Sequence, residues 1–141
     1  MTRLSVPGKL AILRENVRNM GDIPQGTLDA FLVDFRNLQA ALHLLQVSIQ
    51  ILIDLAAYAC ARRGVAPAGT SFGFITALEE AGFLTQDAAA RCAPIFGFRN
   101  RVVHLYDRVD PEIVWHVLRE HRVELLELAE KLVAAGGDDP L

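Results

Sequence analysis

The chain has 141 residues, of which 52% are hydrophobic and 22% charged, and its formal net charge at pH 7 is −3. This length suits one domain with one core, and the apolar content can stabilise a globular fold without disulfides or a metal. The acidic balance excludes a protein that coats nucleic acid along its whole surface, because such proteins neutralise many phosphates with Lys and Arg. Any contact with nucleic acid would therefore use a local basic patch.

The two ends of the chain and its cysteines indicate the compartment. Met1 to Gly8 contains no apolar run of signal-peptide length, and no later segment reaches about 18 uninterrupted apolar residues. Cys60 and Cys92 stand in apolar stretches without CxxC spacing, which predicts buried free thiols in a reducing compartment. We therefore expect a single cytoplasmic domain over residues 1–141, with no membrane span and with 136–141 as a frayed tail.

Helical periodicity dominates between the Gly and Pro positions, and no segment alternates as a strand would. The spacing predicts an all-α chain with five helices, at about 9–20, 27–63, 71–81, 85–103 and 111–135. Gly21 and Gly64 are placed to end the first two, and Thr27 is a plausible N-cap for the second. Asp110, Pro111 and Glu112 supply the N-cap, a first-position proline and a first-turn acid for the last helix.

The predicted second helix is long and apolar around most of its axis. Its exception is one polar stripe at helical spacing, formed by Gln39, His43, Gln46, Gln50 and Asp54. A helix of this composition must be buried on more than one side. In so short a chain this predicts a self-association surface in addition to the intramolecular core.

The stretch from Phe98 to Tyr106, at the end of the fourth predicted helix, carries most of the polar chemistry. Asn100 and His104 are four residues apart and share a helix face, whereas Arg99 lies about 140° around the axis from His104. One helix alone does not bring those two side chains together, but a bent terminus or a second protomer could.

The charge around this stretch is locally basic. Between Arg91 and Arg108 four arginines stand against one acidic residue, Asp107, which is a local charge of +3. A histidine can take the proton from a ribose 2′-OH while guanidinium groups stabilise the phosphate oxygens, and this chemistry requires no metal. From these residues alone, a simpler role in capping helix carbonyls or solvating the surface remains the alternative.

The run Phe98-Arg99-Asn100-Arg101-Val102-Val103-His104-Leu105-Tyr106 resembles the motif of the HEPN superfamily in its HepT form: Arg, four residues, His, one residue, Tyr. The segments 110–115 and 46–64 resemble that family's last helix and its long second helix, and the similarity covers roughly 39–132. The resemblance implies a five-helix up-and-down bundle that forms a homodimer, in which two Arg-His motifs meet in one cleft and cleave RNA without a metal.

The same resemblance implies a role for each motif residue. Arg99 and His104 would be catalytic, and Asn100 would orient the histidine or the phosphate. HepT proteins are toxins neutralised by a small nucleotidyltransferase antitoxin, MntA, which in characterised relatives transfers AMP to the motif tyrosine, here Tyr106. Added bulk and negative charge at that point would oppose an RNA phosphate.

Several further residues have a functional and a structural interpretation. Arg91, Arg101 and Arg108 are predicted to contact RNA phosphates, with plain surface charge as the alternative for Arg91 and Arg108. Many family members carry an acid in the long helix at the position where this chain has Gln50. For Gln50 and Asp54 we favour a structural role, as part of the polar stripe, over direct participation in catalysis. Helical spacing favours core positions over base stacking for Phe98 and Trp115.

Two other functions remain open from the sequence. The domain could be a catalytically weak nucleotide-binding or scaffolding partner of a nucleotidyltransferase, with the basic patch holding a nucleotide phosphate. It could also be a purely structural helical dimer, which explains the apolar second helix but leaves the charged motif unexplained. The presence of both His104 and Tyr106 favours the ribonuclease, because a scaffold needs neither.

Overall fold

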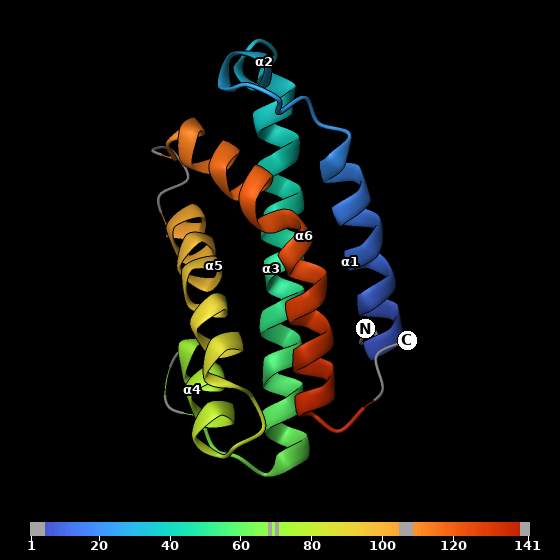
Figure 1. The fold of residues 1–141 in the computed structure, drawn as a ribbon, viewed down its shortest axis with the longest axis vertical. Helices are drawn as coiled ribbons and strands as arrows, with labels where there is room; N and C mark the ends of the chain where they lie inside the picture. Colours follow the sequence, from blue (N-terminus) through green and yellow to red (C-terminus); the bar gives the residue numbers. More distant parts are fainter. Residues whose placement is uncertain (1–4, 68, 70, 105–108, 139–141) are drawn as a thin grey trace.

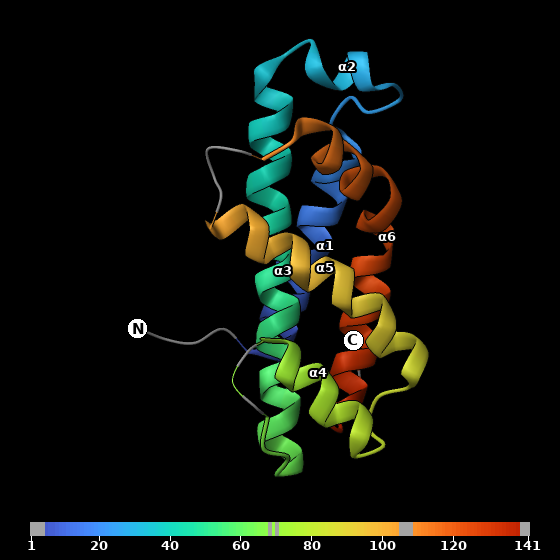
Figure 2. The same cartoon turned by 90° about the vertical axis from the view of Figure 1, so that its left-hand side faces the viewer.

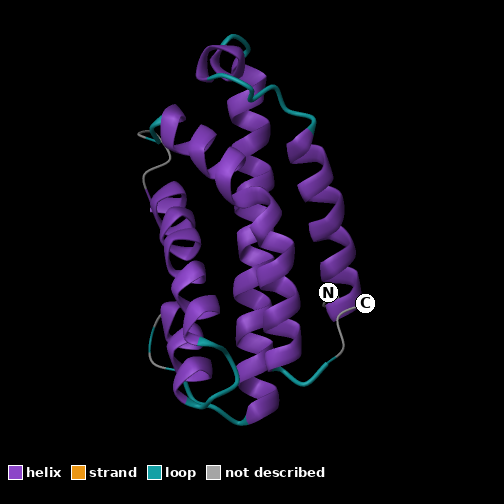
Figure 3. Cartoon of the chain, in the orientation of Figure 1, coloured by secondary structure: helices purple, strands orange, loops and turns teal. Residues whose placement is uncertain are grey.

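The computed structural model describes residues 5–67, 69, 71–104 and 109–138, and within them the side chains of all but 71 and 101–104. This part of the chain forms helices and no strand (Figure 3), which confirms the all-α prediction. The helices are α1 (Val6–Gly21), α2 (Leu28–Leu32), α3 (Phe35–Arg63), α4 (Ser71–Glu80), α5 (Gln86–His104) and α6 (Pro111–Ala135).

The prediction of one long helix from Thr27 to Arg63 is wrong at its start, where the chain forms two helices. Thr27 caps α2 as predicted, with its hydroxyl accepting from the Ala30 N–H, but α2 ends after five residues. Asp34 then caps α3 by accepting from the Arg36 N–H at 2.9 Å. A side chain that bonds its own downstream backbone competes with helix continuation, so the capping aspartate divides the segment.

The first helix begins earlier than the sequence indicated, at Val6 instead of Lys9. Ser5 is its N-cap, and its hydroxyl accepts from the Gly8 N–H at 3.2 Å. Pro7 lies in the first turn, where a missing N–H removes no helical hydrogen bond. A proline that suggested a break therefore belongs to the start of the helix.

The long helix α3 is the centre of the bundle and packs against all five other helices. Figure 1 shows α1 and α5 on opposite sides of α3, with α6 crossing its front and α2 above it. The α3 side chains that these helices bury include Leu45, Ile49, Leu52 and Leu55. The prediction that α3 is buried on more than one side is confirmed, but the other helices of the same chain supply much of that burial.

By length and composition α3 is also the one described helix that could cross a membrane. Just over half of its most apolar 18-residue window, 56%, is buried inside the protein. A central helix of a bundle has the same composition as a membrane span, because it too must be apolar around most of its axis. The packing in Figure 1 accounts for this composition without a bilayer.

The predicted helix ends at Gly64 and Asp110 are confirmed. Gly64 adopts a left-handed conformation with φ 65°, and the Val65 N–H donates to the Cys60 carbonyl, which closes α3. Asp110 accepts from the Glu112 N–H at 2.9 Å and starts α6 at Pro111. At the other end of α6, Arg63 Nε donates to the Ala135 carbonyl at 2.8 Å, so the ends of α3 and α6 are joined.

Both cysteines are buried free thiols, as predicted. The Cys60 thiol lies 3.5 Å from the Phe74 carbonyl, to which it donates. Burial raises the pKa of Cys92 to about 11, so this thiol stays protonated at neutral pH. Neither side chain is available as a nucleophile.

Candidate functional site

The helix that carries the predicted site, α5, is defined by a cap at its start and ends at His104. The Thr85 hydroxyl accepts from the Ala88 N–H at 3.2 Å, and Asp87 lies in the first turn, as predicted. Pro94 lies inside α5 without ending it. The motif from Phe98 to His104 therefore occupies the last two turns of a continuous helix, where the sequence placed it.

Arg99 lies on the inward face of α5. Cys92, Ile95 and Phe96 are buried on this face, and Arg99 follows them at the same helical register. The face that is apolar over most of α5 thus becomes cationic one turn after Phe96, and the Arg99 side chain is half-buried there. A partly buried guanidinium at a helix end can stabilise an anion more strongly than a fully solvated one.

Asn100 is half-buried beside Arg99, and the backbone of α5 continues as helix to His104. Because both Arg99 and His104 belong to this helix, their positions are separated by about 140° around its axis and about 7.5 Å along it. On one regular helix the two positions therefore face different directions. The separation noted in the sequence therefore persists in the structure.

Other predicted site residues lie outside the described part of the chain. Tyr106 and Arg108 belong to 105–108, and the side chains of Arg101 and His104 belong to 101–104. Figure 2 shows α5 crossing α3 obliquely.

Arg91, predicted to contact RNA, is bonded to α6. Its Nη1 and Nη2 donate to the two carboxylate oxygens of Glu127 at 2.9 and 2.8 Å, and Nε and Nη2 both reach Glu124 Oε2 at 3.3 Å. On its other oxygen, Glu124 lies 2.9 Å from His121 Nδ1. The hydrogen bonds with Arg91 lower the pKa of Glu127, and Glu127 raises the pKa of Arg91. We call Arg91, Glu124 and Glu127 the α5–α6 clamp.

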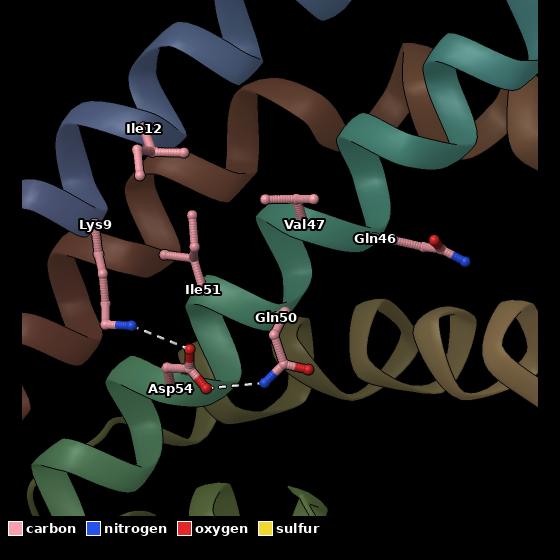
Figure 4. Close-up of a pocket in the computed structure, with 7 residues that line it drawn as sticks. All are labelled: Lys9, Ile12, Gln46, Val47, Gln50, Ile51 and Asp54. Atoms are coloured by element: carbon pink, nitrogen blue, oxygen red, sulfur yellow. Dashed lines mark hydrogen bonds and ion pairs between the residues drawn. The ribbon is translucent and has the colours of Figure 1, made fainter. Parts of the chain in front are cut away.

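The polar stripe of α3 lies beside a pocket of about 330 Å³ between α1 and α3 (Figure 4). Asp54 accepts from Lys9 Nζ at 3.2 Å and from Gln50 Nε2 at 2.8 Å, while Gln46 extends away from Lys9. The carboxylate of Asp54 is thus paired with a cation of α1, which agrees with the interpretation of Gln50 and Asp54 as a polar stripe. Lys9 was not singled out in the sequence, since a lysine 45 residues from its partner leaves no local signal.

The aromatic residues near the motif are part of the packing. Phe98 is buried in the core, as predicted. Trp115 packs against the same core, and its Nε1 donates to the Gln25 carbonyl at 3.0 Å. Among the residues that the structure describes, no group of three or more His, Cys, Asp or Glu side chains is placed to hold a metal ion.

The described helices form an all-α bundle of the kind that the resemblance to HEPN proteins implied. The chain belongs to the HepT-like family, described as ribonuclease HepT-like, whose model matches residues 13–132. This match confirms the family predicted from the sequence and extends the matched region from about 39–132 to 13–132.

Individual relatives agree with the family. The chain is 33% identical over 89 residues to a tRNA nuclease HepT of Aphanizomenon flos-aquae, a match that spans 63% of this chain and 60% of that protein. A crystal structure of the toxin–antitoxin pair MntA–HepT, with a tyrosine replaced by alanine, aligns with a TM-score of 0.80 at 21% identity, over 92% of this chain and 98% of that one.

A further solved structure holds a tri-AMPylated Shewanella oneidensis HEPN toxin in complex with its MNT antitoxin. It aligns with a TM-score of 0.79 at 22% identity, over 92% of this chain and 96% of that one. At such identities the two structural matches establish that this chain shares their fold.

Proposed function

We propose that this chain is an endoribonuclease and the toxin of a toxin–antitoxin pair, which cleaves RNA without a metal ion. The observation that carries the proposal is the half-buried Arg99 on the inward face of α5, in a HepT-like chain whose α5 ends at His104. The relative from Aphanizomenon flos-aquae is named a tRNA nuclease, so tRNA is the first substrate to test. The proposed location is the cytoplasm, where such RNA substrates are found.

In the proposed reaction the RNA supplies its own nucleophile. His104 takes the proton of a ribose 2′-OH, the 2′-oxygen bonds to the adjacent phosphorus, and the bond to the 5′-oxygen of the next nucleotide breaks. Arg99 stabilises the charge that builds on the phosphate oxygens in the transition state, and Asn100 orients His104 or the phosphate. The 5′-oxygen takes a proton from water and leaves as a hydroxyl, His104 later returns its proton to solvent, and the other product ends in a 2′,3′-cyclic phosphate.

The homodimer is part of this proposal, because it brings an Arg99 and a His104 from different protomers into one cleft. The sequence predicted a dimer partly because the long helix is apolar on most sides. The other helices of the same chain cover much of that apolar surface of α3, so this argument for a second copy is weaker. The argument that remains is geometric, since Arg99 and His104 occupy different faces of one helix. A two-fold axis near the end of α5 would place each arginine opposite the partner's histidine.

Arg101 and Arg108 complete the proposed site as contacts to RNA phosphates, which position the strand without reading its sequence. Arg91 was the third arginine predicted for this role. To contact RNA, Arg91 would have to exchange its bonds with Glu124 and Glu127 for a phosphate.

We expect purified protein to cleave RNA in the presence of EDTA and to leave 2′,3′-cyclic phosphate ends. A base and an anion clamp are sufficient for attack by the 2′-OH, so no hydrated metal is needed. Gel analysis of labelled tRNA, with and without phosphatase treatment that distinguishes cyclic ends, measures this. Loss of cleavage on chelation, restored by added Mg²⁺, would contradict metal independence, and absence of cleavage by intact protein under all conditions would favour a scaffolding partner.

The proposed partner is an MntA-like nucleotidyltransferase antitoxin that transfers AMP to Tyr106. The support is that structures sharing this fold include a toxin bound to its MNT antitoxin and carrying AMP. Tyr106 stands two residues after His104, so a phosphate attached to its hydroxyl would compete with the RNA phosphate for the same cations.

Tyr106→Phe should retain most of the RNA cleavage while escaping neutralisation by the nucleotidyltransferase and ATP. The variant keeps the ring but loses the only atom that can accept AMP. Cleavage is measured before and after incubation with the antitoxin and ATP, and mass spectrometry follows the added AMP. Tyr58→Phe is the matched control and should still be neutralised. Full neutralisation of Tyr106→Phe would show that Tyr106 is not the sole acceptor.

A further inference from the structure

We propose that Arg91 is a positioning residue, which joins α5 to α6 through Glu124 and Glu127 and thereby sets the orientation of the end of α5 that carries Arg99 and His104. This inference rests on the proposed ribonuclease function. It goes beyond that function by assigning a role to a side chain away from the reacting atoms. It also gives the opposite expectation to a direct contact between Arg91 and RNA.

The geometry of the clamp is that of a specific link between two helices. The guanidinium binds Glu127 through two parallel N–H···O bonds and Glu124 through two longer ones. The Arg91 and Glu124 side chains are 26% and 22% exposed and are partly withdrawn from solvent, whereas the Glu127 side chain is 53% exposed. Single exposed ion pairs contribute little, but bidentate pairs within a network are the exception because they hold one geometry.

The clamp is also the polar connection between these two helices. In the part of the chain that the structure describes, all side-chain hydrogen bonds from α5 to α6 are made by Arg91. α6 otherwise packs mainly against α3 and α1, while α5 packs mainly against α3 and α4. Apolar packing of this kind fixes the distance between helices better than it fixes rotation about a helix axis, because it has no direction.

Arg91 lies on the same helical stripe as Ile95 and Phe98, next to the stripe that ends in Arg99. Arg99 follows Arg91 by eight residues, about 12 Å along the axis. A rotation of α5 would pull the guanidinium off two carboxylates and would turn Arg99 by the same angle. A displacement of about 1 Å at a catalytic group can lower the rate 100-fold. By preventing rotation of α5, Arg91 therefore keeps the motif residues in the positions that catalysis requires.

Pro94 lies between Arg91 and the motif, inside α5 and without ending it. Proline has no N–H, so the helical bond to the carbonyl of residue 90 is missing at that turn. Beyond it, packing such as that of the Phe96 ring at 6.4 Å from Phe72 holds the motif-bearing turns. This one missing bond does not interrupt α5, and packing on both sides of it keeps Arg91 and the motif on one helix.

A charge swap tests the proposal. We expect Arg91→Glu to lower kcat for RNA cleavage by about fivefold or more with little change in KM, and the double variant Arg91→Glu with Glu127→Arg to return kcat to within about twofold of the parent. Arg36→Glu is the matched control. Arg36 also binds a carboxylate, that of Asp34, with a shortest distance of 2.6 Å, but this pair lies at the start of α3 and not between α5 and α6. It should leave kcat unchanged.

A contact between Arg91 and RNA gives a different result. KM would rise, the dependence of binding on salt would weaken, and the swap would not restore either, because position 91 would still carry an acid. That outcome overturns the proposal. A kcat that is unchanged in Arg91→Glu overturns it as well.

Hydrogen exchange gives a readout that does not require RNA. In Arg91→Glu, amides of residues 95–104 should exchange faster than in the parent, while those of α1 stay the same, and the double variant should restore protection. Equal acceleration throughout the chain would indicate general destabilisation instead and would overturn the positioning role. If intact protein cleaves no RNA, the proposed function fails, and the exchange experiment still decides whether the clamp orders the end of α5.

Discussion

His104→Ala is expected to lower the rate of RNA cleavage by roughly 100- to 10,000-fold, the range that a positioned general base contributes. A ribose 2′-OH is a poor nucleophile at neutral pH unless a base removes its proton, and alanine offers none. Toxicity on expression should disappear with the activity. The fold should persist, because His104 is the last residue of α5 and the core residues of that helix precede it.

The measurement is the rate of tRNA cleavage at matched protein concentration, with circular dichroism to verify helical content. His116→Ala is the control, since it removes an exposed histidine from α6, and it should cleave at the parent rate. If His104→Ala cleaves RNA and stays as toxic as the parent, the ribonuclease function must be abandoned in favour of a scaffold for the nucleotidyltransferase.

Arg99→Lys should lower kcat/KM by at least tenfold, which is about 1.4 kcal/mol of transition-state stabilisation. Lysine keeps the positive charge but loses the planar fork that can bind two phosphate oxygens at once. The loss of kcat/KM should therefore be larger than that caused by an Arg→Lys change at an exposed position away from the site. Arg14→Lys, an exposed arginine of α1, is the matched control and should be neutral.

Mixed dimers connect this prediction to the shared cleft. Neither Arg99→Lys nor His104→Ala should be active alone at the parent rate, but one subunit of each kind leaves one arginine facing one histidine from opposite protomers. Refolding the two variants together should therefore recover more activity than either has by itself. No recovery, in a sample that light scattering shows to be dimeric, would place both residues of a working pair in the same protomer. A fully active monomer would exclude the shared cleft.

The sequence alone was sufficient for the features that depend on neighbouring residues. Caps at Thr27 and Asp110 and the left-handed glycine at Gly64 act on the turn beside them, so the helix boundaries there were predictable. The position of the motif on the last turns of α5 was also predictable, because the helical spacing of the apolar residues of α5 continues up to the motif. The resemblance of the chain to the HepT family was confirmed over residues 13–132.

Local competition explains the predictions about helix boundaries that were wrong. Asp34 can either continue a helix or cap a new one, and both are compatible with the apolar spacing around it. Capping is the outcome in the structure, where Asn37 Nδ2 also donates to the Phe31 carbonyl at the end of α2. Pro7 was equally ambiguous, because a proline ends one helix and starts another with the same fixed φ.

Tertiary structure decided which charges meet. In the sequence Arg91 belongs to a basic stretch and Lys9 to an unremarkable first helix, yet Arg91 binds glutamates 33 and 36 residues away and Lys9 binds an aspartate 45 residues away. Whether an arginine is free for a phosphate depends on which helix lies beside it. Side-chain type and spacing determine the helices and the chemistry available at the end of α5. The packing of α6 and α1 against the bundle determines which charged side chains are already paired. The reason is that ion pairs form between neighbours in space and leave no trace in the local sequence pattern.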